Sequence, residues 1–256
     1  MVDEKNMRQR AEAVAVHETG RDLETSLRRP DGRVALIAEV KRASPSKGEL
    51  VKGEFKPASM AATYQDSGAS AISVLTDERY FRGSLHDLED VRKVVQVPVL
   101  RKDFIVDPYQ VYEARAAGAD AVLLIVAALD DAQLRDLYAL ATEQTLTPLV
   151  EVHDEREAER AVRLGARVIG VNNRDLHSFV TDLRTTERCA RCINSSVEDH
   201  VLVSESGIFT PQDVGRVAVM GACAVLVGES IITSGSIAEQ VKTLSNVMRA
   251  KPSTEE

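Results

Sequence analysis

Five charged side chains in this sequence lie at the ends of short apolar runs. Glu39 and Lys41 end the first run, and Lys102, Glu151 and Glu205 each follow a later one. Residues two apart on a strand point to the same face, so the first two are expected side by side. Carboxylates nearby favour a protonated lysine, which suits a proton donor better than a nucleophilic amine. Burying charges is costly unless they are paired. One such residue is readily a structural ion pair, but five together indicate a functional site.

Strands that alternate with helices would bring these residues together. Eight short apolar, β-branched runs recur, and most are continuously apolar, which is typical of strands covered on both faces. The runs are Val34–Val40, Ala71–Leu75, Val97–Leu100, Ala121–Val126, Thr147–Val150, Val168–Val171, Val201–Val203 and Ala224–Val227. Segments such as Tyr109–Ala117 and Glu155–Leu164 have helical spacing, and Gly118, Gly165 and Gly221 end helices before the next run.

Alternation of this kind predicts a parallel sheet, and eight units predict an α/β fold, a (β/α)8 TIM barrel with an N-terminal helical extension. The alternative is a doubly wound sheet. The length of 256 residues suits one barrel. We expect an amphipathic helical extension packed on the barrel over residues 1–33, a single barrel over 34–250 and a polar tail over 251–256.

Glycine and serine residues after the last two runs predict a phosphate site. Ser206-Gly207 and Gly228 expose backbone N–H groups where barrels commonly bind phosphate, against a short helix N-terminus. The loop of residues 44–48 adds the Ser44 hydroxyl and a lysine, although an ordinary turn would also explain this loop.

Several longer motifs carry a family resemblance. They are Ile37–Gly48 (IAEVKRASPSKG), Pro98–Ile105 (PVLRKDFI), Gly170–Leu176 (GVNNRDL) and Ser204–Ile208 (SESGI), with Ser73–Thr76 and Tyr80–Ser84 as a second loop. From about Val34 to about Ile232 the chain resembles the indole-3-glycerol-phosphate synthase family.

The resemblance implies ring closure, decarboxylation and dehydration of 1-(o-carboxyphenylamino)-1-deoxyribulose 5-phosphate to indole-3-glycerol phosphate in tryptophan biosynthesis. Neither a metal nor an organic cofactor is implied. Lys102 matches the general acid that protonates the ketone oxygen, and Glu151 matches the acid–base residue of the dehydration. Which residue serves which proton step stays open.

The same resemblance implies the remaining site residues. Glu39, Asn172 and Glu205 match residues that orient the substrate and hold the lysines, and Lys41 matches a cation between Glu39 and the phosphate side. Arginine suits a planar carboxylate, as expected for the anthranilate contact. The aromatic residues match walls of the anthranilate pocket, with plain rim packing as the alternative. The expected substrate-binding residues are Ser44, Phe81, Phe104, Arg174, Ser206, Gly207, Leu226, Gly228 and Glu229.

Three features depart from the family pattern. The segment before the first strand is shorter than usual, and in the family that extension helps to cover the site. Glu229 stands where some members place a serine on the phosphate, which leaves a backbone N–H or Ser230 as the donor. Asn173 replaces a small hydroxyl residue of some members.

Composition narrows the partners and the compartment. The net charge of -8 argues against nucleic acid, while local lysines and arginines still suit an anionic sugar phosphate. Three cysteines, an odd and low number, indicate a reducing, cytoplasmic setting. The charged first residues do not resemble a signal peptide, and no apolar run approaches the roughly 18 residues of a membrane helix. A monomer or weak homodimer is expected.

Other readings of the same residues are less favoured. Cys189 and Cys192 have the CxxC spacing of redox or zinc sites, but no second pair exists and they fall on an expected helix. His153 could reach the rim, although a surface or supporting position is favoured. A class I aldolase would use Lys102 as a Schiff-base amine of lowered pKa. Phosphoribosylanthranilate isomerase would place a cysteine where Glu39 and Lys41 stand, and a non-catalytic phosphate-binding barrel would not need Lys102 or Glu151.

Overall fold

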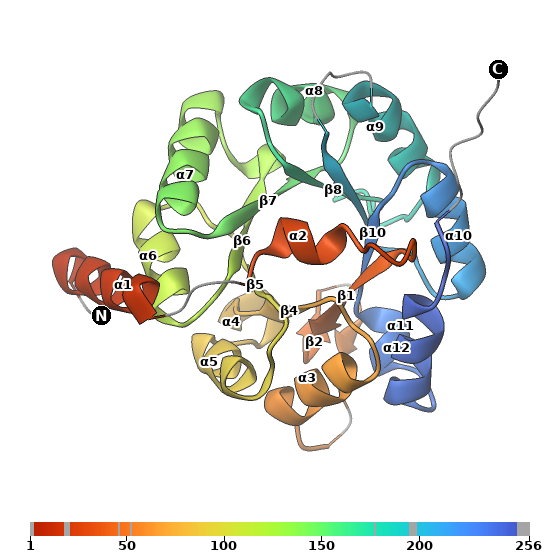
Figure 1. Ribbon diagram of the computed structural model, residues 1–256, viewed down its shortest axis with the longest axis horizontal. Coiled ribbons are helices and arrows are strands. Elements are labelled where there is room, and N and C mark those ends of the chain that lie inside the picture. Colours follow the sequence, from red (N-terminus) through yellow and green to blue (C-terminus); the bar gives the residue numbers. More distant parts are fainter. Residues whose placement is uncertain are drawn as a thin grey trace.

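A closed barrel forms the centre of the molecule. The computed structural model describes residues 3–17, 21–45, 47–51, 53–176, 178–194 and 199–249. Within these residues, eight parallel strands close in the order β1-β10-β9-β8-β7-β6-β5-β4, surrounded by helices (Figure 1). The strands are β1 Ala35–Val40, β4 Ala71–Leu75, β5 Val99–Lys102, β6 Ala121–Ile125, β7 Thr147–Val152, β8 Val168–Asn172, β9 Val201–Glu205 and β10 Ala224–Val227. Because β1 pairs with both β4 and β10, the predicted (β/α)8 barrel is confirmed and the doubly wound sheet is excluded.

The helices and a short hairpin connect these strands. The hairpin is β2 Ala43–Ser44 with β3 Gly48–Glu49, and a 3-10 turn, η1, spans Val126–Ala128. The helices are α1 Glu4–His17, α2 Leu23–Leu27, α3 Pro57–Asp66, α4 Glu78–Phe81, α5 Leu85–Val94, α6 Pro108–Ala116, α7 Asp131–Glu143, α8 Glu155–Leu164, α9 Arg184–Asn194, α10 Pro211–Val219, α11 Glu229–Ile232 and α12 Ile237–Ser245. The three expected helix-ending glycines all adopt positive φ, which favours glycine over residues with a Cβ.

The strands are apolar on both faces because both faces are covered. Alternate residues such as Ile37, Leu100 and Leu149 fill the barrel interior, while their neighbours pack against the surrounding helices. This explains the continuously apolar runs in the sequence. None of the helices in the described ranges is long and apolar enough to cross a membrane.

The N-terminal extension is helical, as expected. It forms two helices: α1 packs on α6 outside the barrel, and α2 lies across one end of it (Figure 1). Leu23 and Leu27 of α2 are fully buried among the interior residues, so this helix fills the amino-terminal end. The predicted tail over residues 251–256 lies outside the described residues.

Four strands run further than predicted. β5 includes Lys102, β7 includes Glu151, β8 includes Asn172 and β9 includes Glu205. The apolar runs end one or two residues earlier because these inward-pointing residues lie in the last layer, next to the open mouth of the barrel. Although their side chains are polar, the backbone of these residues still pairs with the neighbouring parallel strands. The carboxyl-terminal end of the barrel therefore carries the charged residues on rigid strands.

Candidate active site

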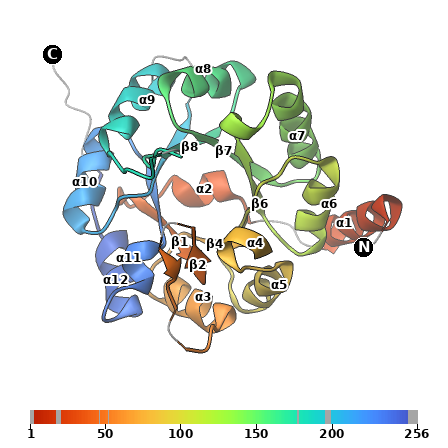
Figure 2. The same ribbon diagram turned by 180° about the vertical axis from the view of Figure 1, so that it is seen from behind.

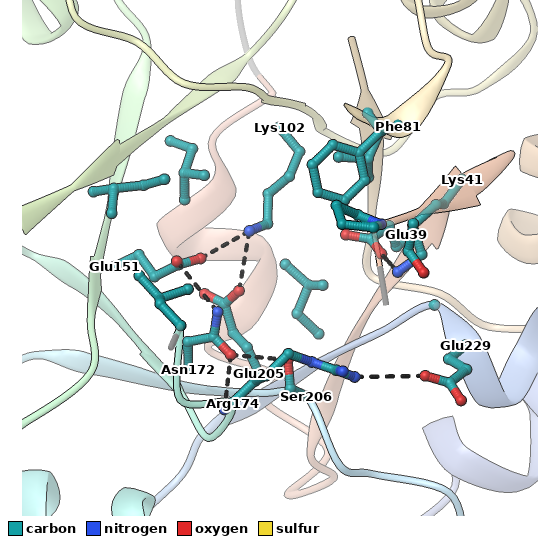
Figure 3. A pocket seen from close by; sticks show the side chains of 18 of the residues that line it. Glu39, Lys41, Phe81, Lys102, Glu151, Asn172, Arg174, Glu205, Ser206 and Glu229 are labelled. Carbon is teal, nitrogen blue, oxygen red and sulfur yellow. Dashed lines mark hydrogen bonds and ion pairs between the residues drawn. The ribbon is translucent and has the colours of Figure 1, made fainter. Parts of the chain in front are cut away.

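A cavity of about 520 Å³ opens at the carboxyl-terminal end of the barrel. Figure 2 shows the molecule from this side, with the β2–β3 hairpin and α4 beside the mouth, and Figure 3 shows the pocket itself. Apolar interior residues, including Leu75, Leu123, Ile125 and Leu226, line its depth. The strand ends and the loops that follow them supply the polar lining.

Lys102 lies between two buried carboxylates. Its Nζ is 2.8 Å from Oε2 of Glu151 and 3.4 Å from Oε2 of Glu205 (Figure 3). The side chain of Lys102 is only 13% exposed. Burial alone would lower the pKa of Lys102, but the charges of Glu151, Glu205 and Glu39 outweigh it and raise the pKa above its usual value. The lysine is therefore held as an ammonium that can donate a proton.

The two carboxylates beside Lys102 titrate in opposite directions. Burial raises the pKa of Glu151, but Lys102 and His153 outweigh burial and hold it below its usual range. For Glu205, burial together with the charges of Glu151 and Glu39 outweighs Lys102 and raises the pKa. Two acids of the same type thus differ in how readily they bind a proton, which is typical of acid–base sites. Glu151 favours the carboxylate form, and Glu205 is the one that binds a proton more readily.

A chain of hydrogen bonds orients Glu151. The Ser206 hydroxyl donates to Oδ1 of Asn172 at 2.8 Å, and Nδ2 of Asn172 donates to Oε1 of Glu151 at 3.3 Å. The backbone N–H of Arg174 also donates to Oδ1 of Asn172. Ser206 adopts a left-handed φ of 65°, which is unusual for a residue with a side chain. That backbone conformation places its hydroxyl on Asn172.

Two glycines leave room for carboxylates. Lys41 binds Glu39 with an Nζ–Oε1 distance of 2.5 Å, as the same-face prediction requires. A Cβ on Gly228 would lie 2.5 Å from that Oε1 of Glu39, and a Cβ on Gly170 would lie 2.1 Å from Oε1 of Glu205. Any larger residue at either position would displace a charged group of the pocket.

Aromatic rings form one wall of the mouth. The ring centroid of Phe104 lies 6.5 Å from that of Phe81 and 6.4 Å from that of Tyr80. Phe104 is 45% exposed and Tyr80 is 50% exposed, so both rings face the open mouth with apolar surface uncovered. The geometry suits a flat aromatic ligand.

On the opposite rim, Glu229 contacts two cations. Its carboxylate is 3.5 Å from Arg174 and 3.6 Å from Lys47. Glu229 is the first residue of α11, and Gly228 before it makes no side-chain cap. The first N–H groups of a helix have no partner within the helix, so they are available to an anion. The Ser230 hydroxyl instead donates to the carbonyl of Ile208, which leaves backbone N–H groups as donors here.

Comparisons with known proteins agree with this geometry. A sequence profile described as indole-3-glycerol phosphate synthase matches residues 1–244. A relative of that name from a Roseiflexus species is 53% identical over 251 residues, which cover 95% of this chain and 90% of the relative. Another, from Leifsonia xyli subsp. xyli, is 53% identical over 209 residues, covering 82% and 79%. The chain belongs to the indole-3-glycerol phosphate synthase family.

Comparison with solved structures supports only the fold of this chain, because the sequence identities are low. Thiamine phosphate pyrophosphorylase from Pyrococcus furiosus has a TM-score of 0.64 and 16% identity, covering 88% of this chain and 97% of its own. An N-acetylmannosamine-6-phosphate 2-epimerase from Clostridium perfringens has a TM-score of 0.63 and 15% identity, covering 88% and 95%. The family resemblance expected from the motifs is confirmed by the sequence profile. The profile begins at residue 1, whereas the motifs indicated a resemblance only from about Val34.

Every residue that the sequence predicted for the site lines this one cavity. They are Glu39, Lys41, Ser44, Phe81, Lys102, Phe104, Glu151, Asn172, Arg174, Glu205, Ser206, Gly207, Leu226, Gly228 and Glu229. Their individual roles stay predictions. The structure adds lining residues that were not singled out: Tyr80, Leu123, Ile125, Phe179 and Phe209. Tyr80 stands next to Phe81 in the sequence, and the two interior residues of β6 alternate with outward ones, but nothing in the sequence marks the two loop phenylalanines.

The departures from the family pattern have structural consequences. No described residue before Glu39 lines the cavity, so the helices of the extension do not cover it. Asn173 is buried and donates to the Ser204 hydroxyl and the carbonyls of Glu205 and Ser206, which ties the end of β8 to β9. Its position is structural rather than part of the pocket.

The cysteine pair lies on a helix. Cys189 and Cys192 are both on α9, as expected, and neither is in a disulfide bond. Burial raises the pKa of Cys189 to about 12 and also raises that of Cys192, so neither thiol is activated. Among the described residues, no group of three or more His, Cys, Asp and Glu side chains is arranged to hold a metal ion.

Proposed function

We propose that this chain closes, decarboxylates and dehydrates 1-(o-carboxyphenylamino)-1-deoxyribulose 5-phosphate to give indole-3-glycerol phosphate. The observation that carries the proposal is the buried Lys102 ammonium, whose Nζ lies 2.8 Å from Glu151 and 3.4 Å from Glu205. The pKa of Glu151 is lowered and that of Glu205 is raised, so the two carboxyl groups differ in how readily they bind a proton. A proton donor and a proton acceptor within one small space are what the two halves of this reaction need.

Binding orients the substrate before any bond changes. Backbone N–H groups at Gly207 and at the start of α11 donate hydrogen bonds to the phosphate, with Lys41 and Ser44 nearby. The anthranilate ring stacks in the wall that includes Phe81 and Phe104. Arg174 reaches its carboxylate, and holding the two reacting carbons together supplies much of the rate enhancement.

In the ring closure, Lys102 donates a proton to the ketone oxygen. The ring carbon that carries the carboxylate forms a bond to the ketone carbon, and the carbonyl π pair becomes the O–H pair of a hydroxyl group. Loss of carbon dioxide then leaves its bonding pair in the ring and restores aromaticity. Glu205 returns a proton to Lys102, since its Oε2 lies 3.4 Å from Nζ.

In the dehydration, Lys102 protonates the leaving hydroxyl group while Glu151 takes a proton from the adjacent methylene carbon. The C–H pair forms the indole double bond and water leaves. Glu151 then returns its proton to Lys102, and solvent restores Glu205. One proton is consumed, and one carbon dioxide and one water are released.

An indole-fluorescence assay with the anilino ribulose phosphate tests this proposal. Lys102→Ala is expected to lose at least about a hundredfold in kcat. Lys93→Ala is the matched control, because Lys93 also pairs with a carboxylate, Asp90, but on the exposed surface. No turnover by the unaltered chain would refute the reaction. Trapping of an adduct on Lys102 by borohydride would instead support the aldolase alternative.

We also propose a cytoplasmic enzyme that is a monomer or weak homodimer. The three cysteines, none of which is in a disulfide bond, support a reducing compartment. Sedimentation at several protein concentrations would test the assembly state, and a stable higher oligomer would contradict it.

A further inference from the structure

His153 lies behind Glu151, on the side away from Lys102. It directly follows β7, and its ring contacts two carboxylates. Nε2 is 3.3 Å from Oε1 of Glu151, and Nδ1 is 3.1 Å from Oε2 of Glu157. The His153 side chain is 11% exposed, so both contacts are largely shielded from water.

Glu157 is itself fixed by the start of α8. Its backbone N–H donates to the side chain of the N-cap residue Asp154, and its Oε2 accepts the backbone N–H of His153 at 2.8 Å. The same Oε2 contacts Nδ1 of the ring. A proton on Nδ1 is thereby directed to Glu157, and Nε2 faces Glu151. The helix terminus therefore sets the orientation of the imidazole ring.

We propose that His153, held by Glu157, is a positioning residue that fixes one oxygen of Glu151 and leaves the other free to react. Oε1 of Glu151 faces His153 and Asn172, whereas Oε2 faces Lys102. This inference rests on the proposed function, because it assigns the acid–base work to Oε2. A carboxylate held through one oxygen presents the other in a single direction.

The two carboxylates in contact with the ring, Glu151 and Glu157, support an imidazolium at this position. Burial would lower the pKa of His153, but the contacts with Glu151 and Glu157 outweigh it and raise the pKa to about 10. Across Glu151 lies Lys102 on β5, which also contacts Glu205 on β9, and Glu39 on β1 acts on the same lysine. The imidazolium adds the cation that keeps Glu151 ionised.

Steady-state kinetics of His153→Gln and Glu157→Gln test the inference. In His153→Gln, kcat is expected to fall at least about tenfold with little change in KM, a part of the 10²–10⁴-fold that a positioned acid–base group contributes. The acidic limb of the kcat–pH profile should move up by about one unit or more, because removing a nearby cation raises the pKa of Glu151. Glu157→Gln should cause a smaller change of the same kind, and the double variant should resemble His153→Gln alone.

His86→Gln is the matched control. His86 also contacts two carboxylates, Glu89 and Asp90, but it is 74% exposed on α5. Folded His153→Gln and Glu157→Gln proteins with unaltered kcat and an unmoved acidic limb would overturn the inference.

A second measurement does not depend on turnover. The ¹⁵N shifts of the His153 ring in the intact protein should show an imidazolium at pH 8, where an unperturbed histidine is neutral. Its pKa should fall in Glu151→Gln. A neutral ring at pH 8 would overturn the inference even if the enzyme is active. A charged ring that responds to Glu151 in a protein without turnover would place the failure in the proposed function instead.

Discussion

Gly170→Ala tests whether the missing side chain of this glycine leaves the space that the Glu205 carboxyl group occupies. Gly170 points into the barrel from β8, and a Cβ there would lie 2.1 Å from Oε1 of Glu205 and 3.2 Å from Cδ1 of Leu149. Leu149 can yield by a few tenths of an ångström, but the carboxylate has to rotate away. Glu205 would then lose its 3.4 Å contact with Lys102.

The expected size follows from two opposing effects. Overpacking a buried position costs about 1–3 kcal/mol, and replacing glycine by alanine within a strand otherwise stabilises by roughly 0.5–1 kcal/mol. We expect a net loss of about 1–2 kcal/mol in the free energy of unfolding, together with a fall in kcat. In a Glu205→Ala background the obstructing carboxylate is absent, so the same substitution should be neutral or stabilising.

Thermal and urea unfolding of the unaltered chain, Gly170→Ala, Glu205→Ala and the double variant would measure the coupling between the two positions. This coupling should be about 2 kcal/mol in the free energy of unfolding. An equal cost of Gly170→Ala with and without the Glu205 side chain would refute the reasoning. The clash would then lie with Leu149 or the backbone, and Gly170 would have no part in placing the carboxylate.

Two further predictions concern the rim and the dependence on pH. Glu229→Gln removes a negative charge at the N-terminus of α11, where Glu229 contacts Arg174 and Lys47. Because that charge repels the phosphate, KM for the phosphorylated substrate should fall severalfold, most at low salt. A raised KM would show that Glu229 instead holds Arg174 in place. The pKa of His153 is raised from 6.5 to about 10, so its contribution to stability is complete below pH 6.5 and is lost as the pH rises toward 10. The difference in Tm between the unaltered chain and His153→Gln should therefore be largest at pH 6 and shrink by pH 9.5, and a difference that grows with pH would contradict it.

The sequence by itself determined the fold class and the membership of the site. Continuously apolar runs, each followed by a helix, leave little choice but a parallel barrel, and a barrel brings all strand ends to one rim. Lys102, Glu151 and Glu205 could therefore be placed together although they are far apart along the chain. The long motifs around them identified the family, because their joint spacing is specific.

Only the tertiary structure decided which charges touch and how each one titrates. Nothing in the local sequence shows that the pKa of Glu205 is raised while that of Glu151 is lowered, because that difference depends on burial and on distances between strands. The sequence alone did not decide whether His153 lies at the rim of the barrel or at the surface. Its two carboxylate partners come from the end of β7 and the first turn of α8. The sequence predicted a helical N-terminal extension on the barrel, but only the structure showed one helix on the outside and another at the amino-terminal end of the barrel. Local propensity specifies elements, whereas pKa values and access to the pocket arise from contacts between elements that are distant in the chain.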